Sequence, residues 1–186
     1  MVTIQELTRQ VSMDLLARTR LGRLACVHGS QPYVVPIYFA YHNECLYSFS
    51  TVGQKIEWMR ANPLVCVEVE EVVDPAHWVT VLVFGRYEEL PDTPEWASIR
   101  TLAHTLLKHH AIWWEPAYAK TILRSIERPL VPVFYRIHCQ RVTGHRAAPE
   151  PAALLGAAPP VTASRERGWF QKLARLLRGQ PRRPAV

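Results

Sequence analysis

The chain has 186 residues, of which 48% are hydrophobic and 20% charged, a composition that suits one ordinary globular core. Its formal net charge of +6 comes entirely from residues 146–186, which hold 8 basic and 2 acidic residues, whereas residues 1–145 hold 14 of each sign. A folded body without net charge argues against a nucleic-acid-binding protein, which attracts phosphates through clustered positive charge.

No segment is typical of secretion or of a membrane span. Residues 1–6 lack a basic start followed by an apolar run, and no apolar window reaches the length of a transmembrane helix. The cysteines are widely spaced and form no C-x-x-C pair, which favours small buried side chains at Cys26, Cys45, Cys66 and Cys139. We therefore expect a cytoplasmic protein with free thiols.

The first part of the chain predicts one short helix and three strands. A helix capped by Ser12 and ending by Gly22 presents an apolar side formed by Met13, Leu15 and Leu16. Strands follow over residues 24–28, 33–41 and 45–50, and a turn-forming Gly-Ser-Gln-Pro sequence joins the first two. Pro36 cannot donate a ladder hydrogen bond, so it predicts an edge or a bulge that leaves backbone groups free for a ligand.

Helices are predicted at further places. Residues 54–61 lack the alternation of a strand, and the Asn-Pro pair that follows them stops the helix. A longer helix runs from Thr93, a suitable cap, to about His109. A short helical piece is expected around Lys120.

Three more strands complete the expected fold, over residues 64–70, 79–87 and 131–142. Gly85, near the end of its strand, indicates a bulge or a close approach of another backbone. Short turns favour antiparallel pairing, so a closed or nearly closed β-barrel with peripheral helices is the most economical architecture.

The composition changes at Ala147, so we expect a domain over residues 1–146 and a tail over residues 147–186. The tail is rich in Ala, Pro, Gly and Arg, as expected of a linker or a disordered segment. Within it, one face of a short basic amphipathic helix is formed by Trp169, Phe170, Leu173, Leu176 and Leu177. Such a helix could bind an anionic membrane or a partner groove, dock on the barrel, or stay disordered.

The loop from Ser50 to Lys55 joins a strand to a helix and is the best candidate for a binding site. Backbone N–H groups at a helix start have no helical partner, and the helix dipole favours an anion there. Ser50 and Thr51 add hydroxyl donors, Gly53 permits close approach, and Lys55 places a cation where the dipole disfavours it unless an anion compensates. The loop predicts a phosphate site, although a capped helix with an exposed lysine explains the spacing equally well.

Residues 46–63, followed by a valine-rich strand and by residues 83–86, resemble the pyridoxamine 5'-phosphate oxidase-like flavin-binding split-barrel family, in its nitroimidazole-resistance-like branch. Residues 22–25 and 35–39 resemble the first hairpin of that family, so the resemblance covers about residues 10–145. It implies a mainly β fold, a six-stranded antiparallel Greek-key split barrel with peripheral helices. It also implies a homodimer that binds FMN in a groove between its subunits.

The resemblance also implies the cofactor-binding residues. The phosphate of FMN would be held by Ser50, Thr51, Gly53, Gln54 and Lys55. The isoalloxazine ring would lie against Pro36, Ile37, Tyr38, Ser48 and Phe49. Trp114, or its neighbour Trp113, would close the slot from the partner subunit. A flavin needs an anion site at one end and an apolar slot at the other, and this set of residues offers both.

The function beyond binding stays open between an FMN-dependent oxidoreductase acting on a small molecule and a non-enzymatic flavin carrier or redox sensor. A third alternative is a barrel tethered to a membrane or to nucleic acid by its basic tail. The chain lacks the arginine-rich C-terminal sequence of true pyridoxamine phosphate oxidases, and Ser48 or Phe49 stands where the nitroimidazole-resistance branch carries a histidine. No catalytic acid or base is named, and no metal site is expected, because His104, His109 and His110 do not share one helical face.

Overall fold

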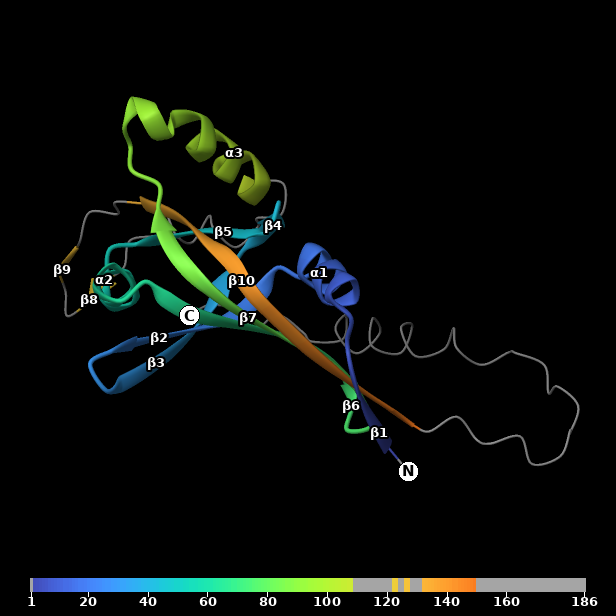
Figure 1. Cartoon of the computed structure of the whole chain (residues 1–186). Coiled ribbons are helices and arrows are strands. Elements are labelled where there is room, and N and C mark those ends of the chain that lie inside the picture. Colours follow the sequence, from blue (N-terminus) through green and yellow to red (C-terminus); the bar gives the residue numbers. More distant parts are fainter. Residues whose placement is uncertain (1, 109–121, 124–125, 128–131, 150–186) are drawn as a thin grey trace, which may run out of the picture. The chain divides into compact units, whose positions relative to one another are not determined.

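The computed structural model describes residues 2–108, 122–123, 126–127 and 132–149 (Figure 1). The elements, in chain order, are β1 (Val2–Glu6), α1 (Arg9–Arg18), β2 (Leu21–His28), β3 (Gln31–Tyr38), β4 (Ala40–His42), β5 (Cys45–Thr51), α2 (Gln54–Ala61), β6 (Leu64–Asp74), β7 (His77–Glu89), the 3₁₀ turn η1 (Pro94–Trp96), α3 (Ala97–Lys108), β8 (Ile122–Leu123), β9 (Ile126–Glu127) and β10 (Pro132–Pro149). No helix among these residues is both long enough and apolar enough to cross a bilayer.

The strands form an antiparallel sheet in the order β3-β2-β6-β7-β10-β5-β4, with β1 paired to the far end of β10. No ladder joins β3 to β4 or β5 among these strands, so the sheet curls but does not close, which is a split barrel. The predicted mainly β split barrel is confirmed. The sheet has eight strands because β1 and the three-residue β4 join the six that the resemblance implies.

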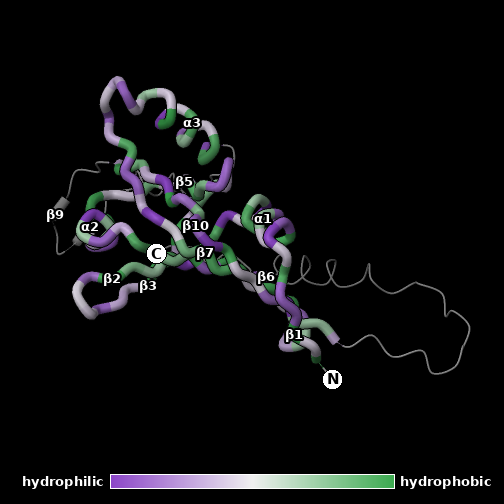
Figure 2. The backbone as a smooth tube through the Cα atoms, viewed as in Figure 1, coloured by the Kyte–Doolittle hydropathy of each residue, from purple (hydrophilic) through white to green (hydrophobic). Residues whose placement is uncertain are grey.

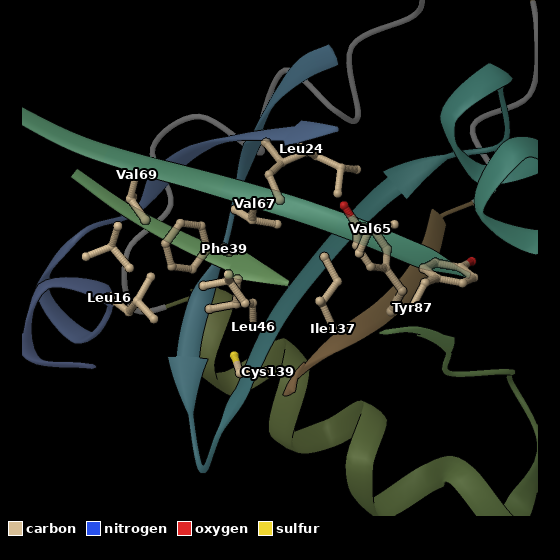
Figure 3. Close-up of a cluster of buried hydrophobic side chains, with 14 of the residues drawn as sticks. Leu16, Leu24, Phe39, Leu46, Val65, Val67, Val69, Tyr87, Ile137 and Cys139 are labelled. Atoms are coloured by element: carbon tan, nitrogen blue, oxygen red, sulfur yellow. The ribbon is translucent and has the colours of Figure 1, made fainter. Parts of the chain in front are cut away.

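The main hydrophobic core lies inside the curled sheet, where Figure 3 shows side chains from several strands and from α1 converging. On β6, Val65, Val67 and Val69 are buried while the residues between them are not, as expected of a strand with one face inward. A second cluster lies on the other face of β5, where Phe49 and Phe134 pack with Ala103 and Leu107 of α3. Figure 2 shows α1 and α3 with both hydrophobic and hydrophilic sections, as expected of helices that bury one side.

The prediction that Ser12 caps the first helix is wrong. The cap is Thr8, whose hydroxyl accepts a hydrogen bond from the Val11 amide at 3.4 Å. Ser12 lies one turn inside α1, buried, and its hydroxyl donates to the Thr8 carbonyl at 3.1 Å, so its polar group is satisfied within the helix. Strand β1 was not predicted, because its residues are mostly exposed and carry no alternation.

The prediction for α2, residues 54–61, is confirmed at both ends. The expected strand over residues 33–41 is interrupted instead: β3 ends at Tyr38, and the Phe39 amide donates to the Arg20 carbonyl at 2.9 Å before β4 begins. The predicted helix after Thr93 begins with a 3₁₀ turn, Pro94–Trp96, and continues as α3 to Lys108. The helical piece expected around Lys120 lies outside the described residues.

Strand β10 continues past the expected end at Val142 and past the expected domain boundary, as far as Pro149. Its last residues stay in the sheet because Ala147 pairs with Trp78 of β7 and with Ile4 of β1. The rest of the tail lies outside the described residues, so the amphipathic helix expected there stays a prediction.

Candidate functional site

The start of α2 is uncapped and open. No side chain of a described residue caps the helix, and the carbonyl of Gly53, the residue before it, accepts the first helical bond from the Glu57 amide at 3.0 Å. The amides of the first turn therefore have no partner within the helix or from a capping side chain. A Cβ atom placed on Gly53 would meet no atom of the described part of the chain within 4 Å, which leaves room beside these amides for an anion.

Lys55, in the first turn of α2, is half-buried, and this burial lowers the pKa of its ammonium group below the ordinary 10.5. The Cys26 thiol of β2 acts in the opposite direction on the same pKa. No carboxylate among the described residues pairs with Lys55, whereas Arg23 pairs with Glu68 at 3.1 Å. A half-buried cation at the positive end of a helix is costly without an anion beside it.

The remaining loop residues lie at the end of β5 and at the start of α2. Ser50 and Thr51 are half-buried at the end of β5, opposite Val133 and Pro132 of β10, and Gln54 is exposed at the first position of α2. The alternative of a capped helix with an exposed lysine is not found, because α2 has no side-chain cap and Lys55 is half-buried. The residues present suit a phosphate group.

The proposed ring-binding strand, β3, lies at the edge of the sheet. Pro36 is exposed and pairs with Arg23 of β2 on one side, with no bulge in the register and no strand paired on the other side within the described part of the chain. The prediction that Pro36 marks an edge is confirmed. The side chain of Ile37 is buried in the core, so this strand offers its backbone to a ligand there.

A hydrogen bond joins β3 to β5 across the split of the barrel. The Ser48 hydroxyl, 1% exposed, donates to the Tyr38 carbonyl at 2.7 Å. The Tyr135 hydroxyl is buried beside it, and burial raises the pKa of Tyr135 to about 12, with Ser48 opposing the rise. Ser48 therefore acts by fixing the backbone of Tyr38, and it joins β3 to β5, the strand that leads into the loop before α2.

Phe49 lies on the opposite face of β5 from Ser48. Its ring stacks 5.7 Å from that of Phe134, in the cluster beneath α3. The structure thus unites the loop, Ser48 and Tyr38, but it directs Phe49 away from them. Trp114, its neighbour Trp113, His109 and His110 lie outside the described residues, so the predicted contact of Trp114 with the flavin stays a prediction.

Sequence reasoning missed three aromatic side chains that flank this site. Trp58 of α2 packs between Tyr33 of β3 and His28 of β2, with ring centroids 5.4 and 5.6 Å from its own. Trp58 follows Lys55 by three positions, so the two side chains share a helix face. This spacing could have placed Trp58 beside the site. The pairing with His28 depends on the hairpin and could not be read from spacing.

Another polar cluster spans the outer face of β5, β7 and β10. The Cys45 thiol lies 3.5 Å from Nδ1 of His138, whose Nε2 lies 2.9 Å from Glu88. Burial raises the pKa of the Cys45 thiol above its ordinary value. Among the described residues, no three His, Cys, Asp or Glu side chains are arranged to hold a metal ion.

Comparison with known proteins gives consistent relatives. A family model described as pyridoxamine 5'-phosphate oxidase matches residues 8–146. An uncharacterised protein of Rhizobium meliloti (strain 1021) is 37% identical over 144 residues, which are 77% of this chain and 95% of that protein. The crystal structure of a FAD-binding protein from Mesorhizobium loti is 40% identical, with a TM-score of 0.65 over 80% of this chain and 99% of that one.

A more distant structure, the FAD binding protein from Mycobacterium smegmatis, is 20% identical, with a TM-score of 0.52 over 76% of this chain and 98% of that one, and supports the fold alone. The family model spans most of the chain, and it covers β2 to β7 together with the loop and nearly all of β10. The open barrel and the loop before α2 agree with this match, and the chain belongs to the pyridoxamine 5'-phosphate oxidase family.

Proposed function

We propose that the protein binds a flavin nucleotide, with the flavin-proximal phosphate at the N-terminus of α2. The observation that carries this proposal is Lys55, a half-buried cation at a helix start that has neither a capping side chain nor a paired carboxylate among the described residues. A phosphate there would accept hydrogen bonds from the free amides of the first turn and neutralise Lys55. The 40% identical protein from Mesorhizobium loti, described as FAD-binding, supports a flavin as the phosphate carrier.

The ring system of the FMN moiety would lie along the backbone of β3 at Pro36, Ile37 and Tyr38. Backbone groups of an antiparallel edge strand point alternately to the paired strand and to the open side, so a flavin would meet the groups of every second residue, and Pro36 has no amide hydrogen to donate. The hydrogen bond from Ser48 to the Tyr38 carbonyl holds this edge in place. These residues bind and orient the cofactor.

The proposed activity is flavin-dependent oxidation or reduction of a small molecule. A bound flavin supplies the transfer of hydride or of single electrons. The protein supplies the anion site, the position of the ring and an open edge beside β3. A flavin carrier or redox sensor would use the same binding residues without turnover.

Purification and loading with FMN or FAD test the proposal, followed by steady-state turnover with NADH or NADPH against a panel of quinones and nitro compounds. We expect a flavin absorption spectrum perturbed by the protein and substrate-dependent reoxidation faster than that of free flavin. Tight binding without turnover above free flavin would leave the carrier or sensor as the function. A protein that takes up neither flavin would refute the site.

We also propose that the protein is a homodimer whose subunits meet at the outer face of β2, β3, β6 and β7. Register places Val34, Ala25, Cys66 and Phe84 in one row across these strands, all pointing outward. Beside this row lies Leu64, 57% exposed, and Val34 itself is 60% exposed. Exposed apolar side chains in adjoining rows of a sheet mark an interaction surface.

Light scattering coupled to gel filtration tests the dimer. We expect a mass of twice the 21.3 kDa of one chain. Val34→Lys, which puts a charge at the β3 end of the apolar row, should shift the mass to that of one chain without unfolding the protein, since Val34 is on the surface. A monomeric parent protein would contradict the proposal.

A further inference from the structure

We propose that the β2–β3 hairpin binds the adenosine half of FAD, with the adenine stacked against His28 beside Trp58, so that the protein takes FAD in preference to FMN. This inference rests on the proposed function, because it continues the same ligand beyond the phosphate at α2. It assigns a second subsite to residues that hold no place in the flavin site itself.

The order of groups along the hairpin matches the order of groups in FAD. Tyr38 pairs with Leu21, Pro36 with Arg23, Tyr33 with Cys26 and Gln31 with His28. Helix α2 packs against β2, where its Trp58 contacts Tyr33 and His28 and the Asn62 side chain after its end bonds to Val27. Lys55 lies one helical turn before Trp58, further from the end of the helix that is bonded to Val27. Along the hairpin, the ring-binding strand segment and His28 lie at opposite ends.

The spacing also fits an extended dinucleotide. Strand residues rise by about 3.3 Å each, so Pro36 and Tyr33 are about 10 Å apart along β3, and Cys26 and His28 are about 7 Å apart along β2. A dinucleotide carries its two phosphates between its two ring systems. With the phosphates at Lys55, the isoalloxazine would reach Pro36 and the adenine would reach His28.

An aromatic surface is present where the adenine would lie. The His28 ring is exposed and tilted by 31° to the Trp58 ring at 5.6 Å, and Tyr33 meets Trp58 edge-on at 5.4 Å. Tyr33 and Trp58 pack partly into the core and are held there, whereas His28 is on the surface. A purine ring can stack on such an aromatic surface without base-specific hydrogen bonds.

The surface is preorganised before any ligand arrives. Asn62 follows the end of α2, and its side-chain amide nitrogen donates to the Val27 carbonyl at 3.2 Å. This hydrogen bond connects the helix to β2 next to His28. At the other end of α2, a Cβ atom on Gly53 would meet no described residue within 4 Å and Val52 is 48% exposed, so the phosphate end is not covered by the described residues. A fixed, partly apolar surface loses little entropy on binding.

Calorimetric titration of FMN and of FAD into the parent protein and into His28→Ala tests the subsite. We expect the parent to bind FAD more tightly than FMN. In His28→Ala the FAD affinity should fall about fivefold to tenfold, the loss expected for one base-stacking contact, while the FMN affinity stays within about twofold of the parent. His77→Ala, which alters an exposed histidine of β7, should change neither affinity.

Different failures separate the two proposals. A parent protein that binds FMN as tightly as FAD, or a His28→Ala variant that loses both affinities equally or neither, would overturn the adenine subsite and leave the flavin site standing. A parent protein that binds neither flavin would overturn both. Thermal melting of each variant without ligand should show that His28→Ala is folded, because His28 lies on the surface and contributes little to the hydrophobic core.

Discussion

Replacing Lys55 by methionine should strongly weaken flavin binding and, at the same time, make the empty protein more stable. Methionine keeps an unbranched, half-buried side chain at this position and removes the ammonium group. The flavin affinity should fall by about a hundredfold or more, as is usual when one partner of a desolvated charge pair is removed. Without ligand, the melting temperature should rise because an uncompensated, half-buried charge is gone.

The opposite signs of the two effects make this prediction specific. A lysine with a merely structural role would lower stability when replaced and would change binding only through that loss. Calorimetry with flavin and melting without it measure both quantities. The matched control is Lys108→Met on the exposed end of α3, which should alter neither. A Lys55→Met protein that binds flavin as tightly as the parent protein would contradict the proposed phosphate site.

The same residue gives the empty protein a distinctive pH dependence. The pKa of Lys55 lies below 10.5 in the folded protein, whereas the unfolded chain keeps the ordinary value. Between these two pKa values the unfolded chain binds more protons, so the free energy of unfolding rises with pH in that window. Lys55→Met should lack this rise, and bound phosphate should suppress it by restoring the charged form.

The second large effect is expected at Gly85, where alanine should destabilise the fold by about 3 kcal/mol or more. A Cβ atom there would lie 2.5 Å from the carbonyl oxygen of His138 and 2.6 Å from a methyl carbon of Ile137. The neighbouring strand cannot move away, because its register shifts between Cys139 and Arg141 and the bulge fixes its path. Urea unfolding of Gly85→Ala measures the loss.

Gly53→Ala is the matched substitution for this experiment. It adds the same methyl group at a position with nothing within 4 Å and with an extended backbone, so stability should be unchanged. The methyl group would instead occupy the space proposed for the phosphate, and the flavin affinity should fall by about tenfold or more. Equal stability losses at the two glycines, or unchanged binding in Gly53→Ala, would contradict the assignment of their roles.

Elements that are set by interactions between residues close in sequence were predicted, whereas elements that depend on contacts between distant residues were missed. Helix α2 was predicted with its bounds because local signals set both ends: the loss of strand alternation after Gly53 and the Asn-Pro pair after Ala61. The close approach at Gly85 was also visible, since glycine near the end of a long strand has few other causes. Strand β1 was missed because only its pairing with β10 makes it a strand.

The candidate site shows the same division. Local sequence indicated a phosphate loop but left an exposed lysine as an equal alternative, and only the packing of α2 on β2 and β3 buries Lys55. Ser48 and Phe49 are neighbours in sequence, yet alternation along β5 sends one to Tyr38 and the other beneath α3. A resemblance that assigns roles to adjacent residues cannot resolve which of them faces the ligand.

Strand β10 also determines when this protein can fold during synthesis. Its 18 residues pair with β5, then β7, and finally β1, which lie roughly 40 to 145 positions earlier in the chain. Contacts of such long sequence separation form slowly, and these contacts cannot form before β10, the last strand of the sheet, has been synthesised. A nascent chain that stops before residue 132 would leave β5 and β7 each with an unpaired edge, so translation presents an aggregation-prone intermediate until β10 emerges from the ribosome.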